Sequence, residues 1–431
     1  MKKLFYCFLI AAVSIASCKK DDNRLFTESP DERLNATLSD YQLTLASSPT
    51  GWNATVVPRN GGIYHFHFTF NNENRVFMFS DFDTLTAKYQ GESSYRLKAL
   101  QQPSLIFDTY SYLHLLSDPD GSVNGGIDGQ GLLSDFEFSL DSLYTDSILL
   151  TGRVNGTKVK LERATQQDLD AWQNGQWAST LTFLNIEEIE NYFKRLTIGG
   201  TEYEIFVDPV SRTMIFQWVS GGTLRRFSTT FYFSANGVVL DEALTNGSQT
   251  ITGFTNISWN ENNQTLMVTA NNTAGIIAGA TKPLRTDLNA PQRWWQTAVN
   301  DGAYWESIRG FHVNGVDDAF KINTLDRFYR LIYYPEFGAG NDLFSPLFVN
   351  AAGDNIELLY GAAPDTPQFT GDGRAIFSLL GFYGPYPSTG PAAMSLTQLL
   401  IPEGYYFVQT SSTSYDMVSA VDAKTWITWT Y

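Results

Sequence analysis

The stretch Y-H-F-H-F-T-F, residues Tyr64 to Phe70, decides the fold class. Its aromatic side chains fall on alternate residues, and His65, His67 and Thr69 occupy the positions between them. Successive side chains of a strand point to opposite faces of a sheet, so this period of two predicts a strand with one buried face. Similar runs recur along the chain, and they predict a mainly β fold.

A few helices are expected between the strands. Ser29, Pro30 and Glu32 supply an N-cap, a proline at the first helical position and a capping box, which predict a helix over about 30–46. Helical spacing returns after Thr165 and again over 186–196. The fold class is therefore α+β, with antiparallel meander sheets.

Several shorter patterns give local predictions. Asn155-Gly156 is a strong hairpin signal between strands over 148–154 and 158–161. A strand is expected over Leu113 to Leu116, and a polar loop over about 271–280. The stretch 226–241 resembles 64–81 in its order of aromatic strand, polar turn and apolar strand. Two interpretations stay open: repeated helix-plus-β units, or hairpin chemistry that many sheets share.

These patterns divide the chain into five segments. They are a signal peptide over 1–17, a lipidated flexible tether over 18–28, an N-terminal helix plus antiparallel β unit over 29–164, a helix plus β unit over 165–284, and an aromatic-rich C-terminal β unit over 285–431.

The first residues indicate export. Lys2 and Lys3 precede an apolar run over 4–15 that is too short to span a bilayer as a permanent helix. The run ends in I-A-S-C, which resembles the lipobox of bacterial lipoproteins and predicts acylation of Cys18. The alternative is an ordinary signal peptide with a chance cysteine.

The segment K-K-D-D-N, residues 19–23, resembles the acidic export signal of Bacteroidota lipoproteins. It favours an anchor in outer-membrane lipid with the protein facing the cell exterior. A plain solvated tether is the alternative.

The charge of the chain limits its possible binding partners, and its cysteine content limits its possible disulfides. Removal of Lys2 and Lys3 would leave 27 Lys and Arg against 45 Asp and Glu, which argues against nucleic acid. Cys7 lies in the predicted signal peptide, so Cys18 would be the only cysteine of the mature chain. No disulfide is expected.

Several motifs together resemble a known family. They are the lipobox, Gly51-Trp52, F-D-T-Y-S-Y-L-H over 107–114, G-x-G-x-x-S-D-F-E-F over 129–138 and the aromatic C-terminal strand. The chain resembles a Bacteroidota lipoprotein family, domain of unknown function 4302. The resemblance implies an accessory role beside SusC/SusD-type nutrient importers. It assigns no catalytic residue.

One loop has the composition of a calcium site. Asp118, Asp120, Asn124 and Asp128 offer hard oxygen ligands on a glycine-rich turn, although the bidentate Glu of an EF-hand is missing. A polar turn rich in Asp and Gly for backbone reasons is the alternative. No other cofactor is expected.

The histidines raise a second metal hypothesis. His65 and His67 share a strand face, and His114 or His312 could supply a third zinc ligand. The alternative is the polar outer face of a half-buried strand.

Enzymatic activity stays open, with a non-catalytic protein favoured. The chain has no G-x-S-x-G elbow, and its mature cysteine would be acylated. Carboxylate pairs suited to a glycosidase, such as Asp81 with Asp83, have the spacing of any solvent-facing strand.

Aromatic residues make up 14% of the chain and are dense in its last third. Flat exposed rings suit stacking on sugars, so a glycan-binding or peptide-binding surface is predicted. Its candidate residues are Trp294, Trp295, Tyr304, Trp305, Tyr383 and Tyr386. Packing in a β-rich core is the alternative for each of them. The loop over 381–391 is the expected exposed segment.

The function predicted from these features is non-catalytic capture or presentation of a polymeric nutrient, with glycan favoured over peptide, beside a SusC/SusD-type importer. A surface hydrolase acting on the same polymer and a purely structural importer subunit are the alternatives.

Overall fold

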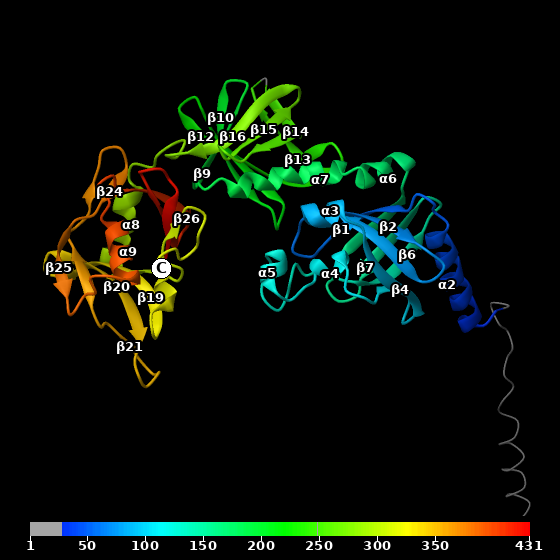
Figure 1. Ribbon diagram of the computed structural model, residues 1–431, viewed down its shortest axis with the longest axis horizontal. Helices are drawn as coiled ribbons and strands as arrows, with labels where there is room; N and C mark the ends of the chain where they lie inside the picture. The colour runs from blue at the N-terminus through cyan, green and yellow to red at the C-terminus, as the bar shows by residue number, and fades with distance from the viewer. Residues whose placement is uncertain (1–27, 248) are drawn as a thin grey trace, which may run out of the picture.

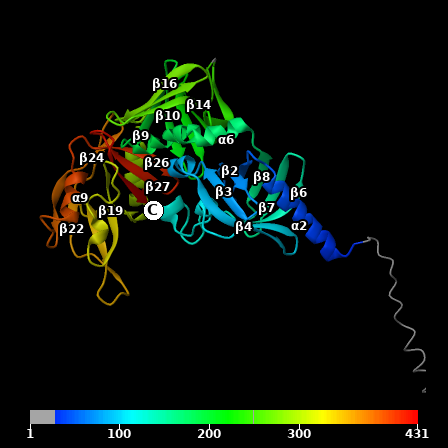
Figure 2. The same ribbon diagram turned by 45° about the vertical axis from the view of Figure 1, so that its right-hand side comes forward.

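The computed structural model describes residues 28–247 and 249–431, and most of them lie in three consecutive β units. Figure 1 shows the second unit between the first and the third, and Figure 2 gives the same arrangement from another side. The predicted signal peptide, Cys18 and nearly all of the predicted tether lie outside the described residues. The mainly β class is confirmed.

The first unit is a closed barrel of eight antiparallel strands that neighbour one another in chain order. Closure comes from β1, which pairs with both β2 and β8. The strands are β1 (Trp52–Val57), β2 (Tyr64–Phe70), β3 (Arg75–Ser80), β4 (Gly91–Ala99), β5 (Pro103–Phe107), β6 (Glu137–Leu143), β7 (Ser147–Gly152) and β8 (Lys158–Arg163).

Helix α2 (Pro30–Ala46) packs against this barrel, and its predicted capping box is confirmed. The Glu32 N–H donates to Ser29 Oγ at 3.2 Å, and the Ser29 N–H donates to Glu32 Oε2 at 2.7 Å. Tyr41 and Leu45 are the buried residues of the helix. Three short helices lie between strands: α3 (Thr84–Lys88), α4 (Tyr112–Leu115) and α5 (Gly121–Asn124).

Side chains fill the interior of the first barrel. Phe66, Phe68 and Phe107 lie in its core with at most 2% exposure. The space around Phe68 and Leu105 is too narrow to admit a water molecule. An eight-stranded barrel is just wide enough for its inward side chains to fill it, and this one leaves no room there for a ligand. A binding site must therefore be sought outside this interior.

The second unit is another closed eight-stranded barrel, in which β9 pairs with β16. Before it come α6 (Gln166–Gln173), α7 (Gln176–Thr180) and the 3-10 helix η1 (Leu181–Glu188). The strands are β9 (Phe193–Ile198), β10 (Thr201–Asp208), β11 (Thr213–Ser220), β12 (Thr223–Ser234), β13 (Gly237–Asn246), β14 (Gln249–Asn260), β15 (Thr265–Ala270) and β16 (Thr273–Ala280).

The predicted meander sheets in repeated helix-plus-β units are wrong. The first two units are closed barrels, and the third is an open sheet of a different strand order. Barrel closure depends on pairs such as Trp52 with Arg163, which are far apart in the sequence. Buried and exposed side chains alternate along a strand in the same way in a closed barrel and in an open sheet, so the sequence pattern does not distinguish them.

Three local predictions are also corrected. The helix expected over 186–196 is instead the end of η1 followed by strand β9. Residues Leu113 to Leu116 lie in and just after helix α4 rather than in a strand. The loop expected over 271–280 is largely strand β16, whose small residues give a weak strand signal.

The third unit is a 12-stranded sheet that curves into a half-barrel with two free edges. Its path runs β23-β24-β26-β27-β28-β17-β19-β20-β22-β25, with β18 on β28 and β21 on β20. Helices α8 (Ala290–Asp301) and α9 (Pro391–Leu399) contribute to its core, and η2 (Ile322–Thr324) is a short 3-10 helix.

The strands of the third unit are β17 (Trp305–Ser307), β18 (His312–Val313), β19 (Phe328–Gly338), β20 (Asn341–Val349), β21 (Ile356–Glu357), β22 (Gly361–Pro364), β23 (Gln368–Phe369), β24 (Arg374–Ile376), β25 (Leu379–Tyr383), β26 (Tyr405–Ser411), β27 (Ser414–Ser419) and β28 (Thr425–Thr430).

A buried ion pair joins the first two barrels. Arg212, in the turn between β10 and β11, reaches Asp81 at the end of β3. Arg212 Nη1 lies 2.8 Å from Asp81 Oδ2, and Nη2 lies 3.1 Å from Oδ1. Burial acts to raise the pKa of Asp81, but Arg212 and His65 outweigh it and hold that pKa below its usual value.

Among residues 28–247 and 249–431, no helix has both the length and the apolar character needed to cross a bilayer.

Candidate functional site

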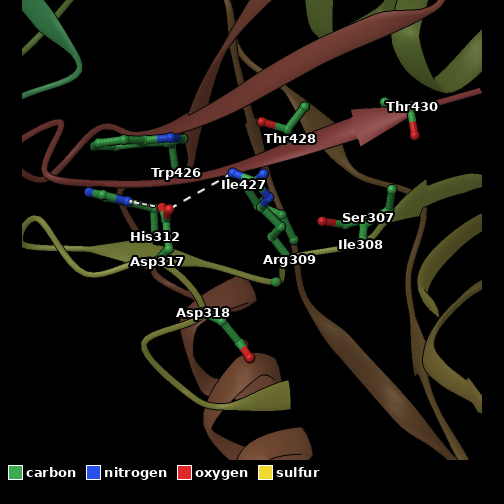
Figure 3. A pocket seen from close by; sticks show the side chains of 11 residues that line it. Ser307, Ile308, Arg309, His312, Asp317, Asp318, Trp426, Ile427, Thr428 and Thr430 are labelled. Carbon is green, nitrogen blue, oxygen red and sulfur yellow. Dashed lines mark hydrogen bonds and ion pairs between the residues drawn. The ribbon is translucent and has the colours of Figure 1, made fainter. Parts of the chain in front are cut away.

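A pocket of about 310 Å³ opens on the third unit where β28 meets the segment 307–318 (Figure 3). Its wall includes an aromatic ring, an imidazole, a guanidinium and a carboxylate. These groups belong to Trp426, His312, Arg309 and Asp317. The volume is at the lower end of the range for small-molecule sites, about 300 to 1,000 Å³.

A tight turn brings two of the polar groups together. Asn314 and Gly315 both have positive φ, at 48° and 79°, as a two-residue type I′ turn requires. The flanking Val313 and Val316 exchange backbone hydrogen bonds of 3.0 Å. The chain therefore reverses direction over two residues, and Asp317 comes to lie beside His312 of β18.

The returned carboxylate orients the imidazole. Asp317 Oδ1 lies 2.6 Å from His312 Nδ1. In Figure 3 the other ring nitrogen of His312 points away from Asp317 and Arg309. Arg309 Nη1 lies 3.9 Å from Asp317 Oδ2, and the two side chains are 80% and 68% exposed. Such an exposed pair is weak, so both groups remain accessible to a ligand.

The aromatic wall is a cross-strand pair. His312 of β18 is the register partner of Trp426 of β28, so their side chains lie on the same face. The two rings stack with centroids 3.7 Å apart and planes at 19°. Along β28 the alternate residues Ile427 and Trp429 point into the core instead.

Two other polar residues of the pocket are held by the protein. Asp318 accepts from the backbone N–H groups of Ile322 at 2.7 Å and Asn323 at 3.0 Å, so it fixes η2. Thr428 donates its hydroxyl to Asp416 at 2.6 Å. The groups free to meet a ligand are thus the imidazole, the guanidinium and one carboxylate beside a flat ring.

The six aromatic residues predicted as a binding surface separate into two groups. Trp294, Trp295 and Trp305 are core residues with 0%, 8% and 1% exposure. Trp295 Nε1 donates to the buried Asp342 at 2.9 Å, and Trp305 Nε1 donates to the Trp294 carbonyl at 2.9 Å. The prediction of an exposed binding surface is wrong for these three tryptophans, because their rings are buried in the core of the third unit.

The three predicted tyrosines lie nearer the surface. Tyr304 is 37% exposed, whereas Tyr383 and Tyr386 are half-buried. Tyr304 and Tyr383 are linked through the rings of Tyr334 and Phe337, with successive centroids 5.7, 5.5 and 5.4 Å apart. The planes meet at 51°, 60° and 84°, so this row offers no flat platform.

The four predicted calcium ligands are hydrogen-bonded within the protein. Asp118 accepts from the hydroxyl of Tyr110, and Asp120, Asn124 and Asp128 bond to backbone groups of their own loop. Asn124 is also 6% exposed. Such contacts occur in a polar turn that satisfies its own backbone, and the calcium site stays a prediction.

The four histidines have separate partners. In chain order their rings contact the Asp81 carboxylate at 3.3 Å, the Thr50 carbonyl at 2.8 Å, the Ser111 hydroxyl at 3.0 Å and the Asp317 carboxylate at 2.6 Å. His67 is buried rather than on a polar outer face. Within the described residues no three His, Cys, Asp or Glu side chains are grouped to hold a metal ion.

Sequence reasoning missed Trp426 and Asp317, although signals for both are present. The alternation of W-I-T-W over 426–429 in the last strand places Trp426 and Thr428 on the face opposite Ile427. V-N-G-V over 313–316 is a hairpin turn signal of the same kind as Asn155-Gly156.

A family profile described as "Domain of unknown function (DUF4302)" matches residues 22–261, more than half of the chain. The chain belongs to this family. The range matched by DUF4302 contains the first barrel and ends just after β14 of the second. The pocket at Trp426 and His312 lies outside that range.

Other comparisons add no argument to the DUF4302 match. No curated protein matches the sequence. Two solved structures of the Helicobacter pylori β clamp, one with 5-chloroisatin and one bound to a DNA ligase peptide, are 8% identical and have TM-scores of 0.14 and 0.13. Each match covers 93% of this chain and 97% of the clamp. The PCNA2-PCNA3 complex from Sulfolobus tokodaii, at 8% identity and TM-score 0.12, covers 58% of this chain and 94% of that chain.

Proposed function

We propose that this DUF4302 protein is a lipid-anchored, non-catalytic capture protein of the outer-membrane surface, and that it binds a polymeric saccharide at the pocket of His312 and Trp426. It acts beside a SusC/SusD-type importer, as the family resemblance of its sequence implies. The anchor is the acylated Cys18.

The composition of the pocket wall is the observation that supports a saccharide as the ligand. The stacked rings of His312 and Trp426 lie beside the exposed side chains of Asp317 and Arg309. The ion pair between these two side chains is long, with 3.9 Å between Arg309 Nη1 and Asp317 Oδ2. Sugar rings present apolar faces and many hydroxyls, which such a wall can contact by stacking and by charged hydrogen bonds. Hydrogen bonds to charged groups are stronger than neutral ones, so they would orient the sugar.

Affinity electrophoresis tests this function. The purified protein is run in native gels that contain pullulan, xylan, arabinogalactan or pectate, and at least one polymer is expected to retard it. Trp426→Ala and His312→Ala should abolish the retardation. Trp259→Ala is the matched control, because Trp259 is a half-buried tryptophan of the second barrel.

Two results would contradict the proposal. One is migration unchanged in every polymer. The other is retardation of Trp426→Ala and His312→Ala equal to that of wild type. Thermal melting of the same preparations checks that the variants are folded.

A surface hydrolase is the second candidate, and the His312–Asp317 contact favours it. A carboxylate on Nδ1 fixes the tautomer of an imidazole and suits the other nitrogen to act as a general base. This alternative predicts reducing ends released from the retarding polymer. Their release should stop in His312→Gln while retardation persists, whereas a capture protein releases none.

A further inference from the structure

A second pocket of about 300 Å³ adjoins the first and lies between the second barrel and the third unit. Its lining includes Lys194 of β9, together with the same His312 and Trp426 that line the first pocket. The stacked pair is therefore a wall shared by both pockets. A chain-like ligand that passes this wall contacts both units.

Short contacts hold the two units together beside this pocket. The Tyr192 N–H donates to the Ala423 carbonyl, and the Asn191 amide donates to the Asp422 carbonyl, each at 2.7 Å. The Tyr192 ring meets Trp426 edge to face, with centroids 5.5 Å apart. The second pocket is thus bounded by a fixed junction.

The cations of the second pocket differ in their pairing. Lys424, at its edge, lies 2.8 Å from Glu190 and is neutralised there. Lys194 Nζ makes no hydrogen bond or ion pair with any described residue, although it interacts with Glu187 over a longer distance. Burial lowers the pKa of Lys194, and the attraction of Glu187 acts in the opposite direction.

Glu187 weakly opposes a bound anion. It lines the pocket but is exposed, so solvent and salt screen its charge. Arg309, which lines the first pocket, is held only loosely by Asp317. Lys194 therefore lines one of the two pockets and Arg309 the other, and His312 and Trp426 are common to both.

We propose that the two pockets are subsites of one site for an acidic oligosaccharide, in which Lys194 binds the carboxylate of a hexuronic acid unit. The proposal rests on the proposed function and names its ligand class. The net charge of −16 acts against a polyanion at long range. Salt screens that effect beyond about 8 Å at physiological ionic strength, so contacts within the pockets decide the affinity.

Calorimetric titration of the whole protein with trigalacturonate and with its methyl ester tests the inference. Esterification keeps the rings and removes the charge. The free acid is expected to bind at least about tenfold more tightly, because a charged hydrogen bond contributes more than 1.4 kcal/mol. Lys194→Met should remove this preference and leave ester binding unchanged, and Lys194→Arg should restore much of it.

Lys158→Met is the matched control, since Lys158 is an exposed lysine on the first barrel. Equal binding of acid and ester by wild type would overturn the inference, as would an unchanged preference in Lys194→Met. Equal binding of a polyglutamate peptide at Lys194 would also overturn it, in favour of an acidic protein ligand. If neutral polymers bind through Trp426 while Lys194→Met has no effect, the inference fails and the proposed function stands.

Discussion

Replacing Arg212 by Met removes the guanidinium from the junction of the two closed barrels while keeping an aliphatic chain at that site. The Arg212 side chain is 2% exposed and that of Asp81 is 0% exposed, so no solvent can replace the lost partner. The guanidinium also lies 3.9 Å from the ring centroid of Tyr64 and donates to the carbonyl of Ile63. Breaking a buried pair by removing one partner costs about 3 to 5 kcal/mol.

The loss is expected to depend on pH. In wild type the pKa of Asp81 is held below its usual value, so its contribution is present above the unfolded pKa and is lost as the pH falls through the folded pKa. Without Arg212, burial is the main influence and raises that pKa. The folded variant then takes up a proton as the pH falls, and the difference in stability from wild type should shrink between pH 8 and pH 5.

Hydrogen exchange, recorded at increasing urea concentrations for the amides of β3 and of the β10–β11 turn, measures the local free energy of unfolding. Arg75→Met is the control, because the exposed Arg75–Glu92 pair contributes about 0 to 1 kcal/mol. The double variant Asp81→Asn, Arg212→Met should lose less than Arg212→Met alone, since no buried charge is left unpaired. A loss for Arg212→Met no larger than that of Arg75→Met would refute the reasoning, as would a loss that grows toward pH 5.

Further variants test other parts of the molecule. Gly51→Ala should lower the melting temperature of the first barrel by more than Gly61→Ala, because both have positive φ but a Cβ on Gly51 would lie 2.4 Å from the Phe68 carbonyl oxygen. Trp294→Ala should cost about 3 to 5 kcal/mol of unfolding free energy in urea, and a loss below 1 kcal/mol would contradict its place in the core. Cys18→Ala should move the protein from the membrane fraction to the soluble fraction, and full retention in the membrane would disprove acylation at Cys18.

Features with a local cause could be predicted from the sequence. The capping box of Ser29 and Glu32 needs only four consecutive residues, and it is present as expected. The predicted Asn155-Gly156 hairpin joins β7 and β8 through residues 153–157, in which Gly156 has a positive φ of 79°. The residues that decide the capping box are neighbours, whereas the hairpin loop is also held by Asp135, which accepts from the N–H groups of Val154 and Asn155.

Barrel closure could not be predicted, because it depends on residues distant in the sequence. Trp52 of β1 pairs with Phe68 on one side and with Arg163 on the other, and the pattern of β1 is the same with or without the second partner. The helical spacing of Ile186, Ile189 and Phe193 predicts a helix by chance, because these residues belong to η1, its C-cap and strand β9.

The candidate site shows the same limit. Composition indicated aromatic side chains in the last third, but it could not tell the core ring of Trp294 from the surface ring of Trp426. His312 and Trp426 are more than 100 residues apart and meet only because β18 pairs with β28. A site assembled across strands has no contiguous motif.

The order of units along the chain is also their order in space. Helix α2 lies at one end of the molecule and the third unit at the other, with the second barrel between them (Figure 1). In a chain anchored at Cys18, the two barrels act as a spacer that holds the pocket of Trp426 away from the lipid. The buried Arg212–Asp81 pair joins the two barrels of that spacer.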